Sequence, residues 1–168
     1  DKLRETLFLS PNAPFECPWG NNSYQWFELT SISPENISKG LLKAGPYLNE
    51  YIDWVKKEFN LSNEKIFFVT FSQGTMMALY HLCKRNEGCA GIMGYSGMLF
   101  FDALFCKEVK SKFPIRLYHG KDDDVIDSYQ TEKASEKFKS LNFDVDFQIK
   151  ENLGHGIDET GLEYGLNF

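Results

Sequence analysis

Ser72 stands in the segment whose residue types are best suited to covalent chemistry. The pentapeptide 70–74, TFSQG, follows an apolar run at 65–69 and precedes an amphipathic run at 76–80. This order predicts a strand, a tight turn that carries a serine, and a helix, which is the layout of a nucleophile elbow. The usual pattern is G-x-S-x-G, and Thr70 occupies the first glycine position. The alternative role for Ser72 is an N-cap, whose side-chain oxygen accepts a backbone N–H of the first helical turn.

A serine nucleophile needs a histidine base within hydrogen-bonding reach and an acid that orients the base. On such an elbow the three residues follow one another as serine, acid and histidine. The sequence contains three histidines, His81, His119 and His155. We expect His81, inside the helix after Ser72, to be structural or solvent-facing, and His119, before a glycine, to be a turn residue bonded to backbone. His155 lies between two glycines after the last predicted strand, so we favour it as the base.

Three consecutive aspartates, Asp122, Asp123 and Asp124, lie between Ser72 and His155 and follow a predicted strand. One of them can be the orienting acid, although position alone does not choose among the three. A solvated acidic turn is the first alternative, because aspartate is common in turns. A cation site is the second, because hard cations prefer clustered carboxylates. No further acidic motif has ligand spacing, so we expect no metal ion.

Predicted strands and helices alternate along the chain. Apolar runs of strand length lie at 6–9, 66–71, 90–95, 115–118 and 145–149. Helices are expected after Ser33, Ser72, Ser128 and Asp158. This alternation favours an α/β fold with a mostly parallel sheet and helices on both faces. Because ligands bind at the carboxyl ends of parallel strands, Ser72, the aspartates and His155 should share one edge of the sheet.

Two features of this pattern carry specific structural expectations. The run 66–71 is continuously apolar, so we expect a strand that is buried on both faces. Gly45-Pro46 lies inside the helix that opens with Ser33-Pro34-Glu35, and a proline there removes a backbone hydrogen bond. We therefore expect a kink or a break at that point.

The composition limits the classes of protein to which the chain can belong. The chain has 168 residues, of which 42% are hydrophobic, which suits one globular domain. Its net charge of -6 argues against a nucleic-acid partner, which needs a clustered basic face. No apolar run approaches the roughly 20 residues of a membrane helix, and no signal peptide is visible. The four cysteines fit no zinc template, so we expect reduced, mostly buried thiols and a cytoplasmic protein.

Over essentially its whole length the chain resembles the acyl-protein thioesterase, lysophospholipase and carboxylesterase group of α/β-hydrolases. The resemblance rests on the motifs SPNAP (10–14), QWF (25–27), FSQG (71–74), HGKDDDVI (119–126) and GHGI (154–157). In such proteins the catalytic aspartate is the third residue after the glycine of a His-Gly pair, which selects Asp123. The histidine of the Gly-His motif corresponds to His155.

The resemblance implies a hydrolase of carboxylic esters or thioesters that needs no cofactor. Ser72 is the expected nucleophile, with His155 as base and Asp123 as the orienting acid. The N–H of Gln73 is one expected donor of the oxyanion hole. The aromatic-rich loop 13–26 either walls an acyl groove or packs as ordinary surface, and on the first interpretation Trp26, together with Phe71, binds a small or lipid-like acyl substrate. Homodimerisation is left open.

Three departures from the family pattern carry their own expectations. Thr70 and Thr75 stand where glycines are usual, adding bulk where strand and helix approach, and Asp127 replaces a common proline. The family's earlier strand, whose His-Gly-rich loop supplies the second oxyanion donor, has no counterpart in the sequence. We therefore expect 1–168 to be a single, N-terminally incomplete domain that lacks N-terminal strands. The alternative function is a catalytically impaired remnant that acts, if at all, as a binding protein.

Overall fold

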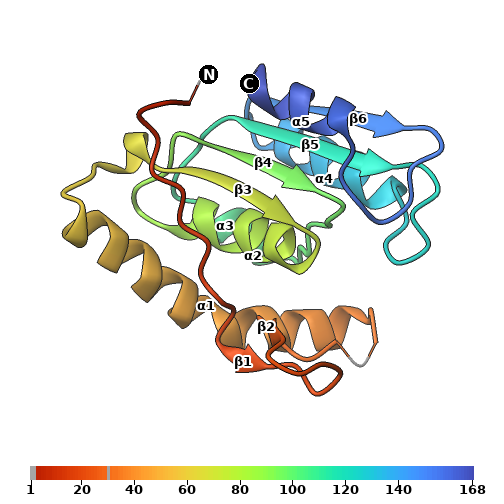
Figure 1. Ribbon diagram of the computed structural model, residues 1–168, viewed down its shortest axis with the longest axis horizontal. Helices are drawn as coiled ribbons and strands as arrows, with labels where there is room; N and C mark the ends of the chain where they lie inside the picture. Colours follow the sequence, from red (N-terminus) through yellow and green to blue (C-terminus); the bar gives the residue numbers. More distant parts are fainter. Residues whose placement is uncertain (1–2, 30) are drawn as a thin grey trace.

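A four-stranded parallel sheet in the order β3-β4-β5-β6 forms the centre of the computed structural model, which describes residues 3–29 and 31–168 (Figure 1). The strands are β3 (Phe67–Phe71), β4 (Gly91–Tyr95), β5 (Ile115–Gly120) and β6 (Val145–Lys150). Each strand pairs in parallel with the next one along the chain. All four carboxyl ends therefore lie at one edge of the sheet, as the alternating pattern predicts.

Helices cover both faces of this sheet, which confirms the expected layering. The helices are α1 (Pro34–Glu58), α2 (Gln73–His81), α3 (Phe105–Glu108), α4 (Tyr129–Ser140) and α5 (Glu159–Leu166), with short 3-10 turns η1 (Asn63–Lys65) and η2 (Leu82–Lys84). On one face, α2 and α4 pack with Ile92 and Leu117 in the main core, and α1 lies against α2. On the other face, α5 covers a smaller cluster of Met93, Tyr95 and Tyr118.

The N-terminus of α1 follows from its first residues. Ser33 accepts a hydrogen bond from the N–H of Asn36 at 3.3 Å, and Pro34 occupies the first helical position. Glu35 places a negative charge in the first turn, where the helix dipole favours it. The predicted helix start is confirmed.

Of the kink or break predicted at Gly45-Pro46, the break is wrong, because α1 continues through Pro46 as one helix. The neighbouring helix α2 supports it there: His81 Nε2 lies 2.8 Å from the carbonyl oxygen of Leu41, and its ring packs on Gly45. A Cβ at Gly45 would lie 2.4 Å from His81 Cε1, so the close approach requires glycine. His81 is therefore a buried, structural residue, which is one of the two roles expected for it.

The prediction that 66–71 is buried on both faces is also wrong. The side chains of Phe67, Val69 and Phe71 are 42%, 65% and 39% exposed, whereas Phe68 and Thr70 on the other face are half-buried. β3 is the edge strand, with α2 on one face, while α5 packs over β4 and β5 on the other. The outer face of β3 is thus an exposed apolar surface.

Residues 6–9 form no strand, although their apolar run predicts one. Leu7 and Phe8 are exposed, and no partner strand lies beside them among the described residues. A strand needs such a partner for its backbone groups. Within the loop 13–26, by contrast, two short antiparallel strands form a hairpin that was not predicted, β1 (Phe15–Glu16) and β2 (Tyr24–Gln25).

Candidate active site

Ser72 forms a sharp turn between β3 and α2. Its backbone adopts φ 51° and ψ -116°, a left-handed conformation that costs a non-glycine residue about 1–3 kcal/mol. The turn is fixed from both sides, since Ser72 N–H donates to Tyr95 O at 2.9 Å and Ser72 O accepts from Thr75 N–H at 3.0 Å. The hydroxyl makes no capping hydrogen bond with α2. The geometry is therefore that of an elbow that presents the serine side chain, and not that of an N-cap.

The structure brings the predicted Ser72, Asp123 and His155 together at the carboxyl edge of the sheet, from the ends of β3, β5 and β6. Ser72 Oγ lies 3.0 Å from His155 Nε2, and His155 Nδ1 lies 2.7 Å from Asp123 Oδ2. An ionised carboxylate only accepts hydrogen bonds, so Nδ1 carries the hydrogen in this pair. The Nε2 lone pair is then free to accept the Ser72 proton.

Asp123 is the aspartate of the three that turns inward, while Asp122 and Asp124 are exposed. Its Oδ1 accepts the N–H groups of Val125 and Ile126 at 2.9 and 2.8 Å. Burial opposes the charge, but these N–H groups and His155 outweigh it and hold the pKa of Asp123 below its usual value. Of the residues described, no three His, Cys, Asp or Glu side chains are grouped so that they could hold a metal ion.

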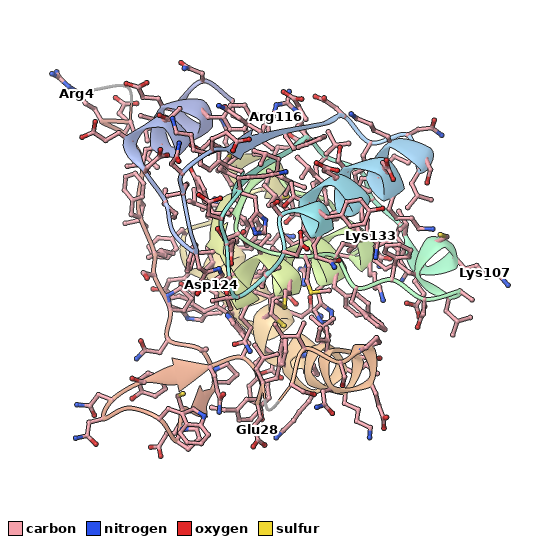
Figure 2. All side chains as sticks on the ribbon, turned by 90° about the vertical axis from the view of Figure 1, so that its right-hand side faces the viewer. Arg4, Glu28, Lys107, Arg116, Asp124 and Lys133 are labelled. Atoms are coloured by element: carbon pink, nitrogen blue, oxygen red, sulfur yellow. The ribbon has the colours of Figure 1, made fainter. Side chains whose placement is uncertain are left out.

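The loops that carry Asp123 and His155 run side by side, and Asp124 marks the first of them in Figure 2. Asp122 N–H donates to Leu153 O at 2.9 Å. At Gly120 a Cβ would lie 2.2 Å from that same carbonyl oxygen, so the loops can meet only if this residue is glycine. A side chain at position 120 would separate the acid from the histidine.

Sequence reasoning missed two residues that support this site. Ser96, at the end of β4 with φ 44°, directs its hydroxyl to Gly156 O at 3.4 Å and so contacts the His155 loop. His119 was predicted to be a turn residue bonded to backbone, and it does contact Ile126 O at 2.9 Å. It also lies 3.0 Å from Asp123 Oδ2. Its spacing of four residues before Asp123 was the available signal.

Gln73 links the elbow to the aromatic-rich loop. Its side-chain Oε1 accepts Trp26 N–H at 2.7 Å, and its Nε2 donates to Phe27 O at 2.8 Å. As the first residue of α2, Gln73 has a backbone N–H without an intrahelical partner. Trp26 thus lies next to the elbow, and the exposed ring of Phe71 lies against His155 with centroids 4.9 Å apart.

The two threonines that replace usual glycines fit the elbow because β4 makes room for them. Thr70 Oγ1 and Thr75 Oγ1 lie 3.1 Å apart, and Thr75 Oγ1 donates to Tyr95 O at 3.0 Å. A Cβ at Gly94 or Gly97 would lie 2.8 or 2.4 Å from Thr75 side-chain atoms. The extra bulk is therefore taken up by glycines on the neighbouring strand and its following turn.

A separate polar cleft of about 460 Å³ lies at the other end of α2 from Ser72. Its charged side chains pair with one another, including Lys56 with Glu87 and Arg85 with Asp53.

None of the helices in the described part of the chain is long and apolar enough to cross a bilayer. The four cysteines are free; Cys83 is buried and Cys106 is exposed, so fewer thiols are buried than expected.

Comparisons with known proteins show which family the chain belongs to. The model of the phospholipase/carboxylesterase family matches residues 2–168. Esterase YpfH of Escherichia coli is 28% identical over 152 residues, which is 89% of this chain and 64% of that protein. Acyl-protein thioesterase 1 of Emericella nidulans is 24% identical over 179 residues, covering 96% of this chain and 74% of that one.

Solved structures are also similar to this chain. The crystal structure of esterase PE8 matches with a TM-score of 0.90 and 31% identity, covering 94% of this chain and 74% of that chain. The crystal structure of Arabidopsis thaliana SOBER1, at 21% identity and a TM-score of 0.74 over 95% of this chain and 80% of that one, shares the fold. The chain thus spans 64% of the length of YpfH and 74–80% of the other three proteins. It belongs to the phospholipase/carboxylesterase family of α/β-hydrolases.

Proposed function

We propose that this chain is a serine hydrolase that cleaves carboxylic esters or thioesters through an acyl-enzyme. The observation that carries the proposal is the hydrogen-bonded series Ser72 Oγ, His155, Asp123, with distances of 3.0 and 2.7 Å. A serine, a correctly oriented imidazole and a buried carboxylate are the parts that acyl transfer to serine requires. The names of the relatives, esterase and acyl-protein thioesterase, support the same class of reaction.

In the proposed reaction Ser72 Oγ attacks the acyl carbonyl carbon while His155 Nε2 takes its proton. The backbone N–H of Gln73 donates to the oxyanion, and we assign the second oxyanion donor to no residue of this sequence. As the tetrahedral intermediate collapses, the bond to the leaving alcohol or thiol breaks, and His155 gives that group the proton. A water molecule, deprotonated by His155, then releases the acid and restores Ser72. Asp123 stabilises the imidazolium throughout.

Trp26 and Phe71 are the proposed contacts for the acyl substrate. The ring of Phe71 is 39% exposed and lies against His155, so its free face borders the reacting atoms. Trp26 is held next to the elbow by Gln73. An aromatic surface with few polar groups suits a small or lipid-like acyl chain. The side chains and water supply every proton and nucleophile in this scheme, so no cofactor is invoked.

The test compares the Ser72→Ala variant with the unaltered chain, using short p-nitrophenyl esters. We expect Ser72→Ala to lose at least about a thousandfold in kcat. Ser135→Ala is a matched control, because Ser135 is buried and its hydroxyl makes no hydrogen bond to the described residues. Turnover that survives Ser72→Ala unchanged would overturn the assignment.

The remnant alternative is less well supported. A protein that had lost catalysis would have no need of a strained elbow and of an aspartate that is buried against His155. A fluorophosphonate probe separates the two, because it reacts only with an activated serine. Labelling of Ser72 supports the hydrolase, and a folded chain with an unlabelled Ser72 supports the remnant.

A further inference from the structure

We propose that His119 is a positioning residue that holds the Asp123 carboxylate with a second imidazole N–H. This inference rests on the proposed function, in which Asp123 orients His155. His119 lies in β5, one residue before its end, and its side chain is 0% exposed. Nε2 lies 3.0 Å from Asp123 Oδ2 and 2.9 Å from Ile126 O, and Nδ1 lies 2.7 Å from Thr131 Oγ1.

The neighbours of His119 determine where its proton lies. Both atoms facing Nε2, a carboxylate oxygen and a carbonyl oxygen, can only accept hydrogen bonds, so Nε2 must carry a hydrogen. Nδ1 faces the hydroxyl of Thr131, which can donate, so Nδ1 can remain unprotonated. Burial lowers the pKa of His119 below its ordinary value and keeps the ring neutral. A neutral ring with hydrogen on Nε2 satisfies every partner.

The carboxylate of Asp123 consequently has four donors, two on each oxygen. Oδ1 receives two backbone N–H groups, and Oδ2 receives one N–H each from His155 and His119. This arrangement leaves the carboxylate one orientation, with Oδ2 toward His155 Nδ1. The donor from His119 also draws negative charge from the oxygen that faces His155. The contact therefore acts on both the position and the basicity of the acid.

A turn residue alone would need only the contact between His119 and Ile126 O. The further contacts tie the Asp123 loop to two rigid elements, because His119 belongs to β5 and Thr131 belongs to α4. Thr131 is itself 2% exposed, so water does not compete with His119 for its hydroxyl. Loss of the N–H that His119 donates to Asp123 should therefore lower kcat as well as the free energy of unfolding.

Two substitutions of His119 separate these roles, and His81 supplies the matched control. His119→Met fills the volume without a donor, whereas His119→Gln keeps an N–H close to the Nε2 position. His81→Met removes the chain's other buried imidazole, which contacts a backbone carbonyl at the far end of α2. For the full chain we would measure kcat and KM on p-nitrophenyl acetate, the unfolding free energy, and the pKa of Asp123 by carbon NMR of its carboxyl group.

We expect His119→Met to lower kcat roughly ten- to hundredfold, as loss of a hydrogen bond to a charged group does, with KM changed less than about twofold. The pKa of Asp123 should rise in the same variant, and His119→Gln should restore most of kcat. His81→Met should lose stability and keep kcat. An unchanged kcat and an unchanged Asp123 pKa in His119→Met, or a His119→Gln variant no better than His119→Met, would overturn the proposal.

If His119→Met does not fold, the Thr131→Val variant provides a second test of the proposal. It retains the shape of Thr131 and removes the hydroxyl that polarises His119, so the pKa of Asp123 should rise by a smaller amount. No rise in this variant would count against the proposal. The carboxyl titration needs no turnover: absence of Ser72-dependent hydrolysis would refute the proposed function, whereas an unshifted Asp123 would refute the role of His119 alone.

Discussion

Replacing Gln73 by methionine removes both hydrogen bonds between the elbow and the aromatic-rich loop. Methionine has nearly the length of glutamine, so the substitution leaves the volume almost unchanged while Trp26 N–H and Phe27 O lose partners at 2.7 and 2.8 Å. The two backbone groups are partly buried, and each costs about 1–3 kcal/mol when left unpaired. Partial access to water reduces this cost, so we expect a loss of about 2–4 kcal/mol in the anchoring of the loop.

The loss should appear in substrate binding more than in chemistry. The two hydrogen bonds that join Ser72, His155 and Asp123 do not include the Gln73 side chain. If about 1.4 kcal/mol of the anchoring energy is expressed in binding, KM rises about tenfold with a smaller change in kcat. Limited chymotrypsin digestion provides a second assay, because the loop carries Trp19 and Tyr24, and cleavage there should accelerate.

Gln25→Met is the matched control. Gln25 lies in the same loop, but its half-buried side chain donates to Glu16 O within the hairpin at 3.0 Å and not to the elbow. It should leave KM unchanged. If Gln73→Met keeps both the KM and the chymotrypsin resistance of the unaltered chain, the idea that Gln73 anchors the loop is refuted.

Two further predictions concern buried groups. Burial lowers the pKa of His81 from 6.5 to about 4, so between these values the unfolded chain binds more protons, and stability is lost as pH falls through that window. From pH 7 to pH 5 this imidazole accounts for a loss of about 2 kcal/mol, which His81→Gln should remove in urea unfolding curves; an unaltered pH dependence would contradict the assignment. Burial also raises the pKa values of Cys83 and Cys89 to about 12, so at pH 8 only about one ten-thousandth of each thiol is ionised. Iodoacetamide should alkylate exposed Cys106 first, and equally fast labelling of Cys83, measured by peptide mass spectrometry, would show that the core is open.

The parts of the site that follow from the sequence depend on local rules. The order of Ser72, an aspartate and His155 along the chain, together with the rule that parallel strands end at one edge, was enough to predict which side chains meet. The choice of Asp123 among three neighbours came from the family resemblance. In the structure the reason is physical, because the turn N–H groups of Val125 and Ile126 draw that side chain inward.

The features that the sequence did not predict depend on contacts between distant segments. The composition of 66–71 indicates an apolar strand but not whether its second face is covered, and that face is exposed. Pro46 predicts a weak point in a helix, but the support from His81 comes from another helix. The apolar run at 6–9 has strand composition, yet pairing depends on a neighbour that composition cannot supply. The role of His119 likewise depends on a turn that places Asp123 against it.

The most direct test of Ser72 as an activated nucleophile is the rate at which a fluorophosphonate labels it, with the labelled residue identified by peptide mass spectrometry. We expect labelling at Ser72 that slows by roughly a hundredfold or more in His155→Ala, because the base that removes the serine proton is lost. His81→Gln should label at the rate of the unaltered chain. A folded chain in which Ser72 stays unlabelled, or in which labelling is as fast without His155, would contradict the claim that His155 activates Ser72.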